Sequence, residues 1–206
     1  MLRAPVLSLV VFCSVVVWVS AEDQSTARVG SRRISTAVEC AGDLGMGAKS
    51  RRQFCDVLIA DTGGRSIRMV IPPHVDATTL RFDLHNRFLA PAEGHTPAET
   101  FARHAALVAV TSGAGESIGR AAVTREFRTV DDLFDRITAG GRPGGLKAVA
   151  PGPVEAVVMA IPEGVSSVAI VGISLEIFTR TGRAAYDAPG RPVAIASNFR
   201  IEYTPQ

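Results

Sequence analysis

Apolar and polar residues alternate along much of this chain, and this alternation is the feature that most restricts its fold. In the clearest segment, residues 80–85, leucine and phenylalanine alternate with Arg81, Asp83 and His85. A β-strand turns successive side chains to opposite faces, so the apolar residues would point inward and these three polar residues outward. The same period recurs in residues 34–40, 55–59, 173–177 and 199–203. We therefore predict a chain of short strands, most with one buried face.

Turn-forming residues separate these segments. Asp61-Thr62-Gly63-Gly64 and the stretch Ser112–Gly119 are typical of hairpin connections. Residues 154–161 are largely apolar, which predicts a strand covered on both faces. Many short strands joined by hairpins predict a mainly β fold, namely an antiparallel β-sandwich of immunoglobulin-like or jelly-roll-like type.

Two segments favour one or two short helices within this sandwich. Thr129 can cap a helix over Val130–Ile137, in which Asp131, Asp132 and Asp135 lie near the start and Gly140-Gly141 ends it. Residues 96–101 begin with a capping-box spacing and a proline at the first helical position. The alternative fold is an α+β domain in which residues 97–111 and 126–137 are both helical.

The first 21 residues have the pattern of a signal peptide. Arg3 precedes an apolar run over residues 6–19, and Val19-Ser20-Ala21 provides a small-residue cleavage site. The run is shorter than the about 20 residues that cross a bilayer, so we expect no membrane span after cleavage. We predict an extracytoplasmic protein, periplasmic or secreted, in which residues 22–206 form a single domain.

Cys40 and Cys55 remain after removal of the leader, and we predict that they form a disulfide. An even pair of cysteines in an oxidising compartment favours this bond. Two thiols are too few ligands for a metal site, and the histidines lack metal-ligand spacing. We therefore predict neither a metal nor another cofactor. The formal net charge of +2 also predicts no nucleic-acid partner.

Three short motifs resemble catalytic or nucleotide-binding loops. Residues 115–119 match a nucleophile-elbow pattern around Ser117, but every histidine precedes this serine, contrary to the hydrolase order. Residues 42–50 resemble a phosphate-binding loop, but the lysine comes one residue late. Asp61-Thr62-Gly63 resembles the active-site turn of aspartic peptidases, which need two carboxylates that share a proton. Only one such tripeptide is present, so this alternative requires a homodimer that uses Asp61.

The leading interpretation is an exported, non-enzymatic binding or structural module with an unknown protein or glycan partner. Its candidate partner surface is the outward face of Arg81, Asp83 and His85, where we expect His85 to be solvated. The segments 90–101 and 140–153 are further candidate contact loops. The enzyme alternative remains the Asp61 peptidase.

Overall fold

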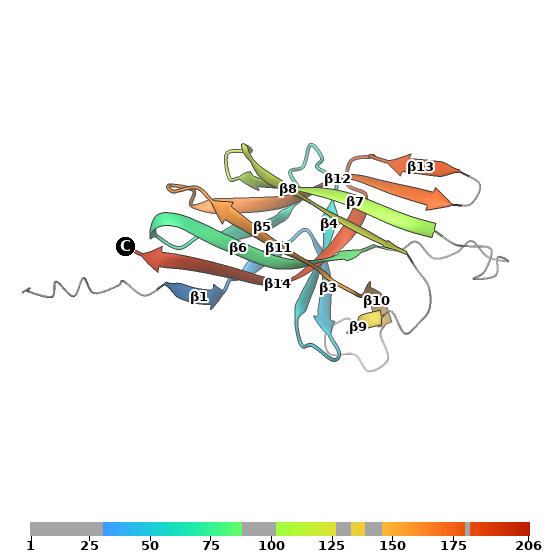
Figure 1. Cartoon of the computed structure of the whole chain (residues 1–206), viewed down its shortest axis with the longest axis horizontal. Coiled ribbons are helices and arrows are strands. Elements are labelled where there is room, and N and C mark those ends of the chain that lie inside the picture. Colours follow the sequence, from blue (N-terminus) through green and yellow to red (C-terminus); the bar gives the residue numbers. More distant parts are fainter. Residues whose placement is uncertain (1–30, 88–101, 127–132, 139–145, 180–181) are drawn as a thin grey trace, which may run out of the picture.

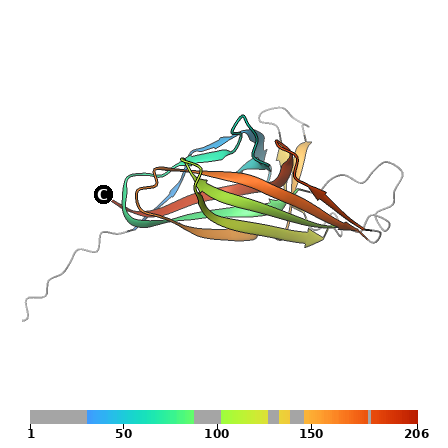
Figure 2. The same ribbon diagram turned by 90° about the horizontal axis from the view of Figure 1, so that it is seen from above.

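A computed structural model describes residues 31–87, 102–126, 133–138, 146–179 and 182–206. All regular elements in these residues are strands, arranged in two antiparallel sheets (Figure 1). Figure 2 shows the long strands of both sheets running in the same general direction. The described part of the chain contains no helix that is long and apolar enough to cross a membrane.

The eight-stranded sheet contains β14, the longest strand among the described residues. Its strands lie in the order β10 (Leu146–Pro151), β9 (Leu133–Thr138), β3 (Gly42–Gly47), β4 (Gln53–Leu58), β14 (Pro192–Pro205), β6 (His74–Asn86) and β11 (Glu155–Ile161), with β1 (Arg32–Ser35) paired to β14.

The six-stranded sheet covers one face of the first. Its strands lie in the order β2 (Val38–Cys40), β5 (Ile67–Val70), β12 (Ser167–Thr179), β7 (Ala102–Ser112) and β8 (Ser117–Glu126), with β13 (Arg183–Tyr186) paired to β12. This architecture confirms the predicted mainly β sandwich.

Alternating side chains of both sheets form the main core. Leu80, Phe82 and Leu84 of β6 are at most 1% exposed, as the sequence predicts. They pack with residues of the facing sheet such as Val108 and Ile170. Burial of these apolar side chains is the main source of stability, at about 1.5–3 kcal/mol each relative to exposure.

A smaller core lies on the opposite face of the eight-stranded sheet. It contains Leu44, Phe54, Ile137, Ala150 and Ile195, with Phe134 packed against it. On β4 and β14, these residues alternate with residues of the main core and point to the opposite face. Strand β4 and residues 193–197 of β14 are therefore buried on both faces. The strand that we expected to be covered on both faces, β11, instead has an alternating pattern and exposes Val158.

The Cys40–Cys55 disulfide is confirmed, and it joins the two sheets. Cys40 ends β2 of the six-stranded sheet, and Cys55 lies within β4 of the eight-stranded sheet, with a Cα–Cα distance of 5.6 Å. Beyond the end of β4, Ile59 forms an isolated parallel bridge with Gly172 of β12. A Cβ atom at Gly172 would lie 2.6 Å from Val193 Cγ2, so this close approach of the sheets requires glycine.

The predicted helix over Val130–Ile137 is wrong where the structure describes it. Leu133–Thr138 forms β9, which pairs with β10, and its Ile137 is buried in the smaller core. The Asp135 carboxylate accepts hydrogen bonds from the backbone N–H groups of Lys49 (3.0 Å) and Ser50 (2.8 Å), so it does not act as a helix-start charge. Long-range pairing thus overrides the local capping signals.

The α+β alternative is also wrong where the structure describes its two helices, because residues 102–112 form β7 and residues 133–138 form β9. The predicted leader, the contact loop 90–101 with its helical segment 96–101, and the cap Thr129 lie outside the described residues. Of the contact loop 140–153, residues 146–151 form β10.

Candidate binding site

Asp61 is bound within its own turn. This turn joins β4 of the eight-stranded sheet to β5 of the six-stranded sheet, so the prediction of a hairpin here is wrong. Its carboxylate accepts a hydrogen bond from the backbone N–H of Arg65 (Oδ1, 3.1 Å) and one from the Arg65 guanidinium (Oδ2, 2.6 Å). The Gly64 N–H donates to the Asp61 carbonyl at 3.0 Å, which closes the turn. The backbone N–H of Arg65, followed by its guanidinium, lowers the pKa of Asp61. A peptidase dyad needs a carboxyl that shares a proton, so this geometry favours a structural role for Asp61.

The hairpin prediction for Ser112–Gly119 is confirmed. The Ser112 N–H donates to the Glu116 carbonyl at 2.8 Å, and Gly115 has a positive φ of 88° in the turn between β7 and β8. Ser117 therefore begins a strand rather than a helix, which is not the context of a nucleophile elbow.

His85 is completely buried, so the expectation that it is solvated is wrong. Its Nδ1 lies 3.0 Å from the Pro151 carbonyl oxygen and its Nε2 lies 3.0 Å from Ser197 Oγ. The rings of Phe54 and Phe134 lie 5.6 Å and 5.2 Å from the imidazole ring. Strands β9 and β10 contribute Phe134 and Pro151, and they cover this end of β6. This burial is the main influence on His85 and lowers its pKa.

The other two residues of the predicted partner surface differ in their environment. Asp83 is half-buried and its Oδ2 accepts hydrogen bonds from Arg52 Nη1 (2.8 Å) and Asn198 Nδ2 (3.0 Å). Asp83 is thereby neutralised by Arg52, which also lies over the Phe134 ring. Arg81 is exposed. Of the three predicted residues, only Arg81 presents its charge to solvent.

A hollow of about 560 Å³ lies elsewhere, on the outer face of the six-stranded sheet. Ala169 and Val171 point into it from β12, whereas their neighbours Val168 and Ile170 are buried in the main core. The turn after Asp61 and the β7–β8 hairpin form its walls. Its polar lining includes Arg65, Ser66, Arg68, Thr111, Ser112 and Ser167. We call this feature the Arg68 hollow.

Arg68 carries the charge of this hollow. Its Nη2 donates to the Gly64 carbonyl at 2.8 Å, and its Nε donates to Ser66 Oγ at 3.3 Å. These two contacts hold the guanidinium in place, yet no carboxylate among the described residues pairs with it. Arg65, in contrast, is paired with Asp61. The hollow therefore presents one positioned positive charge without an ion pair, and the nearest carboxylate across the strand pair is that of Glu39 on β2.

Glycine shapes the opposite wall of the hollow. A Cβ atom at Gly113 would collide with Ser167 Oγ, so the hairpin can approach β12 only with glycine at this position. The Gly113 N–H donates to the Ser167 carbonyl at 2.9 Å, which fixes the hairpin against the sheet.

Sequence reasoning identified both turns, of which only the second is a hairpin, but did not bring them together. The turn at Asp61 and the turn at Ser112 are distant in sequence. They meet because β12 pairs with β5 on one side and with β7 on the other. No local pattern encodes this pairing, so the hollow has no recognisable signal in the sequence.

No protein-family model and no curated protein matches the chain. Among solved structures, the chain is similar to the K1 cleaved adhesin domain of Lys-gingipain from Porphyromonas gingivalis W83, with 8% identity and a TM-score of 0.36, over 86% of this chain and 99% of that one. The K3 cleaved adhesin domain of the same protein gives 11% identity and a TM-score of 0.33, over 74% of this chain and 73% of that one. These low values carry no argument about what this chain binds.

Proposed function

We propose that this chain is an extracytoplasmic, non-enzymatic binding module, and that the Arg68 hollow holds an anionic group of a protein or glycan partner. The observation that carries this proposal is the guanidinium of Arg68, which is held by Gly64 and Ser66 at the hollow without a carboxylate partner.

The chemistry of the hollow fits a carboxylate ligand. A guanidinium binds carboxylate oxygens with two parallel hydrogen bonds, and such charge-assisted bonds are about twice as strong as neutral ones. The hydroxyl groups of Thr111 and Ser167 provide further donors, and Ala169 and Val171 provide a small apolar floor. A few polar groups over an apolar floor are typical of specific binding sites.

The disulfide between the sheets supports the proposed location. Such bonds persist in oxidising compartments and are rare in reducing ones. The signal peptide predicted over the first 21 residues also favours an extracytoplasmic location.

The test is a titration of the purified protein, followed by NMR, with two probes that carry carboxylates. One probe is an acidic tetrapeptide and the other is a tetramer of galacturonic acid, so the protein and glycan sources are distinguished. We expect shifts at Ser167 and Val171 with one probe, and an affinity about tenfold lower in Arg68→Gln, the equivalent of one charge-assisted hydrogen bond.

Arg136→Gln is the matched control, because Arg136 is an exposed strand arginine on the other sheet and lies outside the hollow. It should bind the carboxylate probe like the wild type. Saturating titrations that leave the resonances of the hollow unchanged, or equal affinities of wild type and Arg68→Gln, would rule out the proposed site.

A further inference from the structure

We infer that the outer face of the eight-stranded sheet is a second binding surface, and that it holds an anionic polysaccharide. Three exposed arginines lie on this face, namely Arg33 of β1, Arg200 of β14 and Arg81 of β6, and we call them the arginine face. This surface is independent of the Arg68 hollow, which lies on the other sheet.

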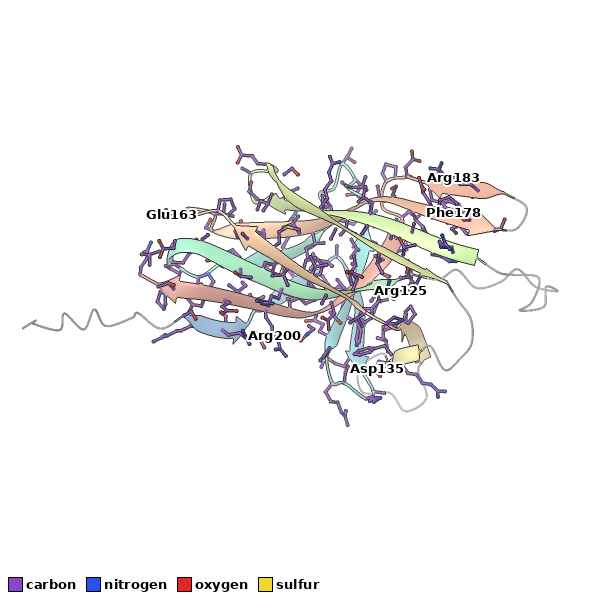
Figure 3. The ribbon with its side chains drawn as sticks, viewed as in Figure 1. Arg125, Asp135, Glu163, Phe178, Arg183 and Arg200 are labelled. Carbon is purple, nitrogen blue, oxygen red and sulfur yellow. A yellow bond between two sulfur atoms is a disulfide. The ribbon has the colours of Figure 1, made fainter. Side chains whose placement is uncertain are left out.

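Strand register places the three arginines together. Arg200 lies directly opposite Arg81 on the neighbouring strand β6, and on its other side it lies opposite Ser35 of β1. Arg33 is two residues before Ser35, so its side chain points to the same face. Neighbouring strands lie about 4.8 Å apart, so the arginines form a row across three strands. Figure 3 labels Arg200 on β14, beside β1.

The row has an excess of positive charge. Glu202 pairs with Arg33 at 3.0 Å and with Arg81 at 3.7 Å, and the hydrogen bond from Arg33 lowers the pKa of Glu202. Within the described ranges, no carboxylate pairs with Arg200. The row therefore contains three guanidinium groups and one paired carboxylate, that of Glu202, although the chain as a whole is nearly neutral.

The opposed pair Arg81 and Arg200 has a cost for the fold. Like charges directly opposite each other on neighbouring strands destabilise a sheet. A bound anion between the two guanidinium groups would remove this repulsion. A ligand that binds only the folded state also stabilises it, so the surface predicts a ligand-dependent melting temperature.

The shape of the surface favours a polymer over a small anion. The arginines lie on a strand face that is open to solvent, where a single ion pair contributes little and salt screens it. A chain with repeated charges can contact several arginines at once, and each contact raises the effective concentration for the next.

Apolar side chains beside the row favour a polysaccharide among the polymers. Val158 of the edge strand β11 lies directly opposite Arg81 and is 53% exposed, and Ala156 and Ala160 flank it on the same face. A sugar ring has an apolar C–H surface beside its charged substituents, which matches a narrow apolar strip next to arginines. The strip is too small to hold lipid chains, because stable insertion takes a large apolar area.

The test uses immobilised heparin as the probe, with the purified full protein. We expect wild type to be retained at low salt and released as salt rises. In solution, Arg81→Gln and Arg200→Gln should each weaken heparin binding several-fold, and the double variant by about tenfold or more. Heparin should raise the melting temperature of wild type more than that of the double variant.

Arg136→Gln changes an exposed arginine of β9 outside both proposed surfaces, so it is the matched control and should bind heparin like the wild type. None of these variants changes the Arg68 hollow, so the result does not depend on the proposed function. Neutral dextran should not bind, which separates sugar contact from charge. The inference is overturned if the double variant binds heparin as wild type does, or if Arg136→Gln weakens binding equally. It is also overturned if vesicles of phosphatidylglycerol or a DNA duplex bind more tightly than heparin.

Discussion

Reduction of the Cys40–Cys55 disulfide should lower the melting temperature by roughly 6–12 °C. The bond closes a loop with a sequence separation of 15 residues. In the chain-entropy model, a loop of this length stabilises the folded state by about 3 kcal/mol, because it restricts the unfolded chain. For a domain of about this size, each kcal/mol changes the melting temperature by roughly 2–4 °C.

The measurement is differential scanning calorimetry on the oxidised and the reduced form of the same chain. Cys55 is completely buried, so the protein should be reduced in denaturant and then refolded in the presence of reductant. This comparison leaves both sulfur atoms in place, so no core cavity contributes to the difference.

The double variant Cys40→Ala and Cys55→Ala is the control, and reductant should not change its melting temperature. Complete reduction of the wild type, shown by mass spectrometry, with an unchanged melting temperature would contradict the expected stabilisation by the disulfide. In that case, the disulfide does not restrict the unfolded chain as the chain-entropy model predicts for a loop of this length.

Two further predictions concern the core. Gly172→Ala should destabilise the protein by about 1–3 kcal/mol in urea denaturation, because the new methyl group meets Val193 Cγ2 at 2.6 Å and the Ile59 nitrogen at 3.0 Å. Gly182→Ala, where a Cβ atom has open space, should change stability by less than about 0.5 kcal/mol, and equal losses at both positions would contradict the close approach of the sheets. Burial lowers the pKa of His85, so the unfolded state binds its proton more readily, and His85 should contribute less stability as pH falls below about 6.5. Unfolding free energies between pH 7.5 and 5 should therefore fall more steeply for wild type than for His85→Gln, and parallel curves would refute this assignment.

The segment 80–85 shows how far alternation predicts the fold. It correctly separates Leu80, Phe82 and Leu84, which face the main core, from Arg81, Asp83 and His85, which face the other way. It does not say what covers that other face. His85 is buried because β9 and β10, which follow much later in the chain, pack over this end of the sheet.

Local helix signals failed for a related reason. The residues around Leu133–Thr138 carry acceptable capping chemistry, but the free energy of this segment is decided by distant partners. Ile137 packs against Phe54, and Asp135 binds the backbone of the β3–β4 turn. A single-sequence pattern contains no information on these contacts.

The turns that form the candidate site could be predicted from the sequence, but their meeting in space could not. The turn at Asp61 and the hairpin at Ser112 were both predicted as turns. Their meeting depends on the central position of β12 in the six-stranded sheet. Arg68 had no distinguishing mark in the sequence, because its lack of a carboxylate partner is a property of the folded surface.

The burial of β4 on both faces has a consequence for strand alignment. In a strand with one buried face, a shift by one residue would expose the apolar side chains, and this cost fixes the pairing. In β4, Phe54, Cys55, Val57 and Leu58 are all buried, so alternation alone selects the correct alignment only weakly. The covalent bond from Cys55 to β2 permits one alignment and excludes its neighbours, and it thereby protects this strand from slippage during oxidative folding.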